Sequence, residues 1–252
     1  MNRRMVLYVV GTVIKIEAAL MLLPLITSII YKENCVKDIL ISIAVALASG
    51  FVLTLLSRPG SKVIYAKEGF VIVSLSWIAL SLIGALPFYI SGEIPDFVDA
   101  FFETVSGFTT TGASVLTDVE AMSKGLLFWR SFTHWVGGMG VLVFVMAIIP
   151  TVSDRSIHLL RAEAPGPVVG KIVPKMKQTA RILYVIYIVL TLIEMVLLYV
   201  GGMPLFDSIA HAVGTAGTGG FGIKADSLAS YSPYIQWVIT AFMLLFGVNF
   251  TL

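Results

Sequence analysis

The chain has 252 residues, a formal net charge of +2 and 58% hydrophobic residues, but only 13% of its residues are charged. A soluble domain of this length carries about 25% charged residues, so the composition excludes an ordinary soluble protein. The sequence shows no metal-ligand cluster, nucleophile triad or nucleotide-binding fingerprint, and we therefore expect neither an enzyme nor a nucleic-acid-binding protein.

Six stretches are apolar and long enough to cross a bilayer, which takes about 20 residues. In chain order they cover roughly 5–30, 37–56, 70–90, 126–150, 179–201 and 234–252. Two shorter helices are expected at about 97–108 and 204–214, and at about 1.5 Å rise per residue they reach only about halfway across. The sequence therefore predicts an all-α polytopic membrane protein with six transmembrane helices and two re-entrant pore helix-loop segments.

The order of these elements divides the chain into four parts. Residues 1–57 form an N-terminal pair of transmembrane helices, and residues 69–150 form a first helix–pore loop–helix repeat. A basic loop, 151–178, leads to a second repeat, 179–252. The last helix stops within apolar sequence and has no flanking charges, so we expect this repeat to be truncated at its end.

Lys and Arg residues are divided unequally between the two sides of the predicted membrane. One side holds eleven of them: Arg3, Arg4, Arg58, Lys62, Lys67, Arg155, Arg161, Lys171, Lys175, Lys177 and Arg181. The other side holds four: Lys32, Lys37, Lys124 and Lys224. Because cytoplasmic loops carry the excess of basic residues, we expect a cytoplasmic N-terminus and 151–178 loop, and localisation in the plasma (cell inner) membrane.

Acidic residues gather on the opposite, outer side or in the short helices. They are Glu33, Asp38, Glu93, Asp96, Asp99, Glu103, Asp118, Glu120, Asp207 and Asp226. An acidic vestibule would concentrate cations in front of a pore. Ordinary solvation of the outer loops explains the same distribution, and the sequence leaves both interpretations open.

Two polar segments that contain glycine repeat at nearly constant spacing. They read FVDAFFETVSGFTTTGAS and LFDSIAHAVGTAGTGGFG. Asp99 and Asp207 are 108 residues apart, whereas Gly112 and Gly219 are 107 apart. A non-helical loop at membrane depth is tolerated only where protein buries it or where it lines a watery path. The duplication favours an ion path over the alternative, which is a pair of glycine-rich connectors packed between helices.

The composition of these loops suits a dehydrated monovalent cation. Backbone carbonyls can replace the water shell of the ion and still allow it to leave, and glycine adopts the backbone conformations that such a row of carbonyls requires. The C-terminal end of each short helix points toward its loop with about half a negative charge. Asp99 and Asp207, one in each short helix, are expected to support these pore helices.

Several polar side chains lie on or near the predicted pore helices, and some of them are candidates for supporting these helices. Arg130 and His134 are one helical turn apart, and we expect Arg130 to contact the first pore helix, with Glu103 as its partner. His134 is either a packing residue or a proton relay. His211 stands where Glu103 stands in the first repeat, which suggests that it supports the second pore helix.

Glu17 and Glu194 lie inside predicted spans. Carboxylates within a membrane are often functional, but a position near a helix end or a local pairing is the explanation that we favour over a role in transport. Gly137, Gly138 and Gly140 permit either close helix packing or a bend, and we favour packing.

Several segments resemble the Trk/Ktr/HKT potassium transporter superfamily. SGFTTTGAS and GTGGFG look like its two filter loops, and LLFWRSFTHWVGGMGVLVFVMAIIP looks like the second helix of its first repeat. HLLRAEAPGP, KIVPKMKQTARILYVIY and the extra N-terminal helix pair are similar to the TrkH/TrkG branch. The resemblance covers essentially the whole chain.

The resemblance implies which residues would line the filter. Its carbonyls correspond to those of Thr109, Thr110, Thr111, Gly112, Ala216, Gly217, Thr218 and Gly219. Glycine at the key position goes with K⁺ in this superfamily, and serine in the first loop goes with Na⁺ in some plant relatives. The resemblance thus implies K⁺ as the transported ion, bound at Thr110, Thr111, Gly112, Gly217, Thr218 and Gly219, with no organic cofactor.

The resemblance also implies partners. Its pore subunits are homodimers that sit in membrane lipid on a ring of cytoplasmic, nucleotide-binding TrkA-type regulatory subunits. They have four helix–loop–helix units around one pore, whereas this sequence has two, so we expect half of a four-repeat K⁺ channel-like pore that does not conduct alone. A proton- or sodium-coupled K⁺ symporter and a non-conducting membrane fragment that needs further chains are the alternatives.

Overall fold

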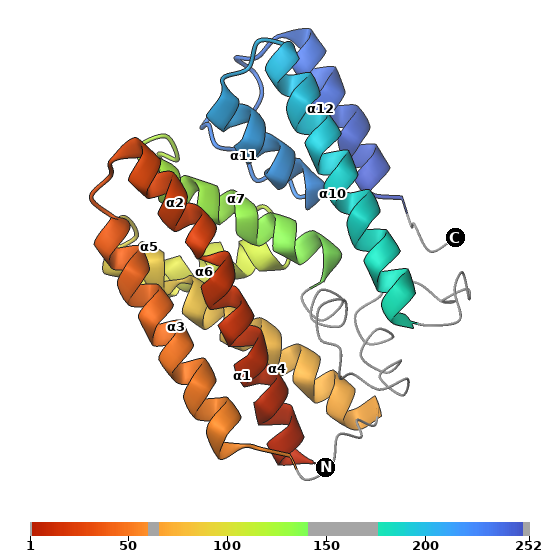
Figure 1. Cartoon of the computed structure of the whole chain (residues 1–252). Coiled ribbons are helices and arrows are strands. Elements are labelled where there is room, and N and C mark those ends of the chain that lie inside the picture. Colours follow the sequence, from red (N-terminus) through yellow and green to blue (C-terminus); the bar gives the residue numbers. More distant parts are fainter. Residues whose placement is uncertain (1, 60–65, 141–175, 249–252) are drawn as a thin grey trace.

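The computed structural model describes residues 2–59, 66–140 and 176–248. These parts of the chain consist of helices and connecting loops, and no strand occurs among them (Figure 1).

The N-terminal part is a hairpin of long apolar helices. Helix α1 (Arg3–Leu20) continues after a one-residue break into α2 (Leu22–Tyr31), and α3 (Val36–Leu56) returns beside them. α2 ends where Lys32 adopts a left-handed conformation with φ of 56°, a common way to terminate a helix. Gly11 and Gly50 face each other between α1 and α3, and a β-carbon on Gly50 would lie 2.9 Å from the Gly11 carbonyl oxygen. Small residues at this position allow the two helices to pack closely.

Four helices make up the second described part, residues 66–140. They are α4 (Ala66–Gly84), α5 (Leu86–Ile90), the short α6 (Phe97–Phe108) and α7 (Lys124–Met139). Pro87 stands in the first turn of α5, a position that tolerates proline because the N–H there has no helical partner.

Three helices make up the last described part. They are α10 (Met176–Val200), the short α11 (Leu205–Ala216) and α12 (Pro233–Phe246). α10 and α12 lie beside each other, and α11 packs against both (Figure 1).

Four stretches among the described residues are long and apolar enough to cross a membrane: Arg3–Tyr31, Val36–Leu56, Lys67–Ile90 and Arg181–Val200. They coincide with four of the six spans expected from the sequence. The other two expected spans, 126–150 and 234–252, contain α7 and the apolar α12, and both run past the described residues. Large apolar side chains cover the outer faces of the long helices, for example Phe51 and Leu55 on α3 and Val196 on α10.

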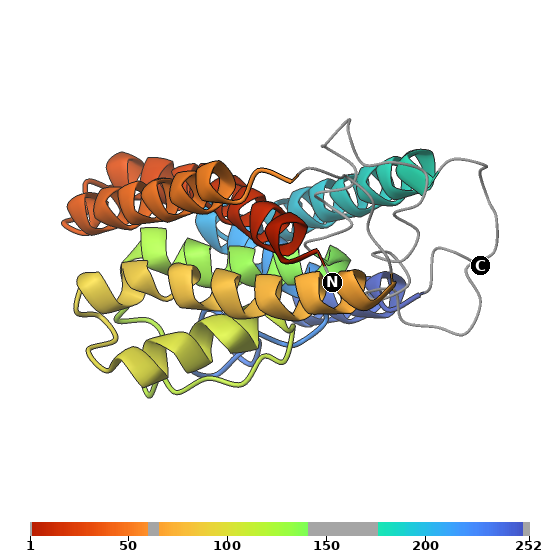
Figure 2. The same cartoon turned by 90° about the horizontal axis from the view of Figure 1, so that it is seen from below.

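Helix α7 lies at the centre of the described structure. It packs against α2, α6 and α11, and its side chains from Gly125 to His134 are buried. Seen from below, α7 runs between the layer of α1–α3 and the layer of α4 and α6 (Figure 2). A helix buried on several sides by apolar neighbours provides a rigid support for the loops that touch it.

Candidate functional site

The two short helices have the same length but begin differently. α6 and α11 each contain 12 residues. The Asp96 carboxylate caps α6 by accepting hydrogen bonds from the N–H groups of Val98 at 2.7 Å and Asp99 at 3.3 Å. This is the usual role of aspartate before a helix. α11 begins after Pro204 and has no such side-chain cap.

The loops after the two short helices have matching backbone conformations. Thr110 and Thr218 have φ of 52° and 60°, and Gly112 and Gly220 have φ of 76° and 70°. Both pairs are 108 residues apart, so the backbone pairs Gly112 with Gly220, one residue beyond the Gly219 that the sequence comparison selected. Threonine rarely adopts positive φ, and its occurrence twice at the same place indicates that both loops follow the same path.

The main chains of the two loops lie in direct contact with each other. A β-carbon on Gly112 would overlap the carbonyl oxygen of Gly219, and one on Gly219 would lie 2.5 Å from the carbonyl oxygen of Thr110. The segments are more than 100 residues apart in sequence, yet there is no room for a side chain between them. The two loops therefore lie in contact with each other in the fold.

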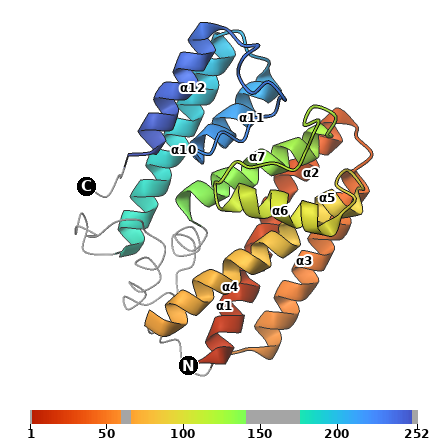
Figure 3. The same ribbon diagram turned by 180° about the vertical axis from the view of Figure 1, so that it is seen from behind.

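The C-terminal ends of both short helices converge on a glycine pair of α7 (Figure 3). A β-carbon on Gly137 would overlap the Phe108 carbonyl at the end of α6. A β-carbon on Gly138 would lie 3.0 Å from the Ala216 carbonyl at the end of α11. Gly137 and Gly138 thus serve close packing, as expected, and the negative ends of two helix dipoles meet at this point.

His134 of α7 joins the first repeat to the second loop. The Gly219 N–H donates a hydrogen bond to His134 Nε2 at 3.1 Å, and the ring stacks on Phe221 with 5.1 Å between centroids. The imidazole also faces the Gly107 carbonyl of α6. Since Nε2 accepts this hydrogen bond, it carries no proton in this arrangement. The Nδ1 of His134 has no hydrogen-bond partner among the described residues, but the contacts of Nε2 and of the ring favour a packing residue over a proton relay.

We expect His134→Ala to loosen the second loop, because it leaves the buried Gly219 N–H without an acceptor. An unsatisfied buried donor costs about 1–3 kcal/mol, so the Gly219 amide should exchange with deuterium faster by about fivefold or more. His134→Gln offers an amide oxygen to the same N–H and should recover most of the protection. Equal exchange rates in the wild type and the alanine variant, measured by mass spectrometry of the 214–222 segment, would refute this role.

Arg130 holds both loops through three contacts. Its Nε donates to Glu103 Oε1 at 2.6 Å, its Nη1 donates to the Gly222 carbonyl at 2.7 Å, and its guanidinium lies 3.4 Å from the centroid of the Phe221 ring. Glu103 in turn accepts from Ser114 Oγ and from the Val115 N–H beyond the first loop. The side chains of Arg130 and Glu103 are 2% and 0% exposed. The predicted contact between them is present. Arg130 also contacts the second loop, which was not expected from the sequence.

Asp207 and His211 lie on α11 with different surroundings. Asp207 accepts a hydrogen bond from the Tyr231 hydroxyl at 2.8 Å. Burial and this hydrogen bond raise the pKa of the Tyr231 phenol well above its ordinary value. His211 packs edge-on against the Tyr231 ring, and its Nε2 has no hydrogen-bond partner among the described residues.

Two acidic residues of the connecting loops cap helix α7. Glu33 accepts hydrogen bonds from the N–H groups of Lys124 and Gly125, and Glu93 accepts from the N–H of Ser123. Negative charge at a helix N-terminus is stabilising. For these two residues the structure supplies a local role, which the sequence pattern had not indicated.

Two buried carboxyl groups of the long helices, those of Glu17 and Glu194, face the short helices. Glu17 of α1 is 1% exposed and lies near Thr104 and Phe108 of α6, around the position of Gly84. Glu194 of α10 is fully buried and lies beside the Thr215 hydroxyl of α11. Glu17 lies in the last turn of α1, but near the middle of the apolar stretch Arg3–Tyr31, because α1 continues into α2. Glu194 lies six residues before the end of α10.

Comparison with known proteins identifies a family and several relatives. The family model for TrkH, described as a cation transport protein, matches residues 35–252. The chain is 37% identical over 256 residues to the Trk system potassium uptake protein TrkH of Salmonella typhimurium, and this match covers 100% of the chain and 53% of that protein. It is 33% identical over 252 residues to the Trk system potassium uptake protein TrkG of Escherichia coli, with 99% and 52% covered.

A solved structure is similar over the whole described fold. The crystal structure of the potassium transporter TrkH from Vibrio parahaemolyticus matches with a TM-score of 0.84 and 31% sequence identity. The match covers 100% of this chain and 51% of that one. The chain thus spans about half the length of the relatives that it matches.

Proposed function

The chain belongs to the TrkH family of cation transport proteins, and from this premise we propose that it forms part of the pore of a K⁺ uptake transporter. One observation carries the proposal: the main chains of the two Thr/Gly loops meet without any side chain between them, at Gly112 and Gly219. The named relatives are potassium uptake proteins. This is a membrane transporter family with several apolar spans, and not an enzyme family.

The ion would be held by backbone carbonyls of both loops. In the first loop these belong to Thr109, Thr110, Thr111 and Gly112. In the second they belong to Ala216, Gly217, Thr218 and Gly219, and the backbone register adds Gly220 as the counterpart of Gly112. Carbonyl oxygens at close range replace water around a monovalent cation, and the C-terminal ends of α6 and α11 favour positive charge beside them. Glycine rather than serine at position 112 favours K⁺ over Na⁺.

Two loops would surround only half of an ion. We propose that the conducting unit needs two further helix–loop–helix units, because the chain spans about half the length of its relatives. The loops would enter from the outer face of the cell inner membrane, with the N-terminus and the 151–178 loop in the cytoplasm. That loop, of which residues 151–175 lie outside the described part of the chain, would face a TrkA-type regulatory subunit, and the pore would work as a homodimer in lipid.

Growth and ⁸⁶Rb⁺ uptake in cells that lack their own K⁺ importers test this proposal. We expect the 252-residue chain alone to restore no uptake, and the chain joined to the C-terminal half of a TrkH relative to restore it. A membrane-inserted hybrid that never supports uptake would contradict the proposed pore, and uptake by the chain alone would contradict the need for two further units.

Coupling of K⁺ movement to protons is a second candidate, favoured by one observation. Glu17 is buried beside α6 and its carboxyl oxygens have no hydrogen-bond partner among the described residues. A carboxyl in such a place within a membrane is often functional. Uptake that depends on external pH and loses this dependence in Glu17→Gln, Glu194→Gln or His134→Ala would support symport, whereas uptake that is insensitive to pH would exclude it.

A further inference from the structure

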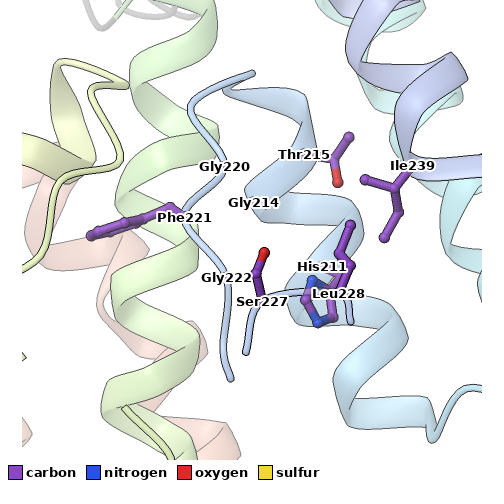
Figure 4. A pocket seen from close by; sticks show the side chains of 9 residues that line it. All are labelled: His211, Gly214, Thr215, Gly220, Phe221, Gly222, Ser227, Leu228 and Ile239. Carbon is purple, nitrogen blue, oxygen red and sulfur yellow. The ribbon is translucent and has the colours of Figure 1, made fainter. Parts of the chain in front are cut away.

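A small cavity lies behind the second loop, on the side away from α7. Its volume is about 30 Å³, and its lining includes His211, Gly214, Thr215, Gly222 and Ser227 (Figure 4). His211 and Thr215 belong to α11, whereas Gly222 and Ser227 belong to the loop that follows. Phe221 lies in the same loop, but its side chain points toward α7, where its ring stacks on that of His134.

His211 brings an unsatisfied polar atom to this cavity. The residue is 6% exposed, and its Nε2 has no hydrogen-bond partner among the described residues. A buried nitrogen without a partner costs roughly 1–3 kcal/mol, so such atoms are normally satisfied by protein or by ordered water.

The corresponding space behind the first loop is filled by polar side chains. Ser106 Oγ donates to the Ala113 carbonyl at 2.5 Å, and Ser114 Oγ donates to Glu103 at 2.8 Å. Arg130 completes the set by its ion pair with Glu103. These contacts fasten the first loop to its pore helix.

The second repeat lacks these side chains at the matching positions. With the spacing of 108 residues that the backbone conformations define, Ser106 corresponds to Gly214, Ser114 to Gly222 and Arg130 to Val238. His211 takes the place of Glu103. Two hydroxyls and one guanidinium are therefore missing, and the cavity lies where they would have been.

We propose that this cavity is a water-binding site in which ordered water takes the place of the missing hydroxyl groups and hydrogen-bonds to His211 Nε2. A buried water needs about 10–15 Å³ and two to four polar partners, so the space holds about two. Ser227 and the main chain of Gly220 and Gly222 line it and supply further partners. Water fits better than a cation, because the guanidinium of Arg130 already binds the carbonyl of Gly222, which lines the cavity.

Solid-state NMR of the full gene product in lipid, with ¹⁵N-labelled histidine, tests the site directly. The chain has three histidines, so His211→Phe assigns the signal by its loss. We expect a cross-peak between His211 Nε2 and water protons. Gly222→Ser should weaken it about twofold, because the added hydroxyl displaces one of about two waters. Its β-carbon would meet no atom closer than 3.7 Å, so the variant should fold.

Gly92→Ser is the matched control, because it adds the same hydroxyl where nothing lies within 4 Å of the new β-carbon. It should leave the cross-peak unchanged. A wild-type protein without a water cross-peak to His211, or a high-resolution map in which the cavity is empty or filled by a lipid chain, would overturn the proposal. The proposed water site does not depend on which ion the protein transports, so a failed uptake experiment would not contradict it.

Discussion

Gly112→Ser is expected to reduce the preference for K⁺ over Na⁺ at least about tenfold, which corresponds to about 1.4 kcal/mol. Gly112 has φ of 76°, and its β-carbon position overlaps the Gly219 carbonyl oxygen. A side chain there must push the two loops apart. The added strain comprises about 1–2 kcal/mol for a left-handed conformation and about 1–3 kcal/mol for overpacking. The relevant measurement is competition between Na⁺ and ⁸⁶Rb⁺ uptake in the hybrid transporter.

Gly92 offers a control with the same backbone angle. Its φ is also 76°, but a β-carbon there would meet nothing within 4 Å. Gly92→Ser therefore carries the conformational cost without the overlap, and we expect unchanged ion preference. If Gly112→Ser discriminates between the ions as well as Gly92→Ser does, the loops do not hold the ion at this point.

The sequence predicted the elements well because apolar length and helix signals are local. Four expected spans and both short helices are present near the expected residues. The break at Met21 between α1 and α2 was not predicted. Pro24 nevertheless marks the place, because proline has no N–H to donate to the Leu20 carbonyl four residues earlier and its ring crowds that carbonyl.

The candidate site was predictable where side chains recognise each other. Opposite charges on Arg130 and Glu103, in otherwise apolar helices, predicted their contact correctly. The contact of His134 with Gly219 could not be found this way, because the partner is a main-chain N–H that leaves no signature in sequence. The pairing of Gly112 with Gly220 also needed the structure, since two adjacent glycines, Gly219 and Gly220, fit the sequence pattern equally well.

The buried ion pair should dominate the stability of the site. Removing one partner of a buried pair costs about 3–5 kcal/mol, because the remaining charge is left without compensation. We therefore expect Arg130→Gln to lower the free energy of unfolding by about this amount, measured by denaturant unfolding in detergent. Glu103→Gln removes the negative charge that compensates the buried guanidinium, but the new amide oxygen can still accept a hydrogen bond from Arg130. Its effect on the free energy of unfolding should therefore be smaller.

The double variant distinguishes charge from packing. Arg130→Gln combined with Glu103→Gln leaves no isolated charge, and it should be more stable than Arg130→Gln alone. Glu17→Gln is the matched control, since it neutralises a buried carboxyl that has no hydrogen-bond partner among the described residues, and it should change stability little. If the double variant is instead less stable than Arg130→Gln by the full effect of Glu103→Gln, the two residues act independently. The pair would then not be the link that fixes the second loop at Gly222 to the first loop at Ser114 and Val115.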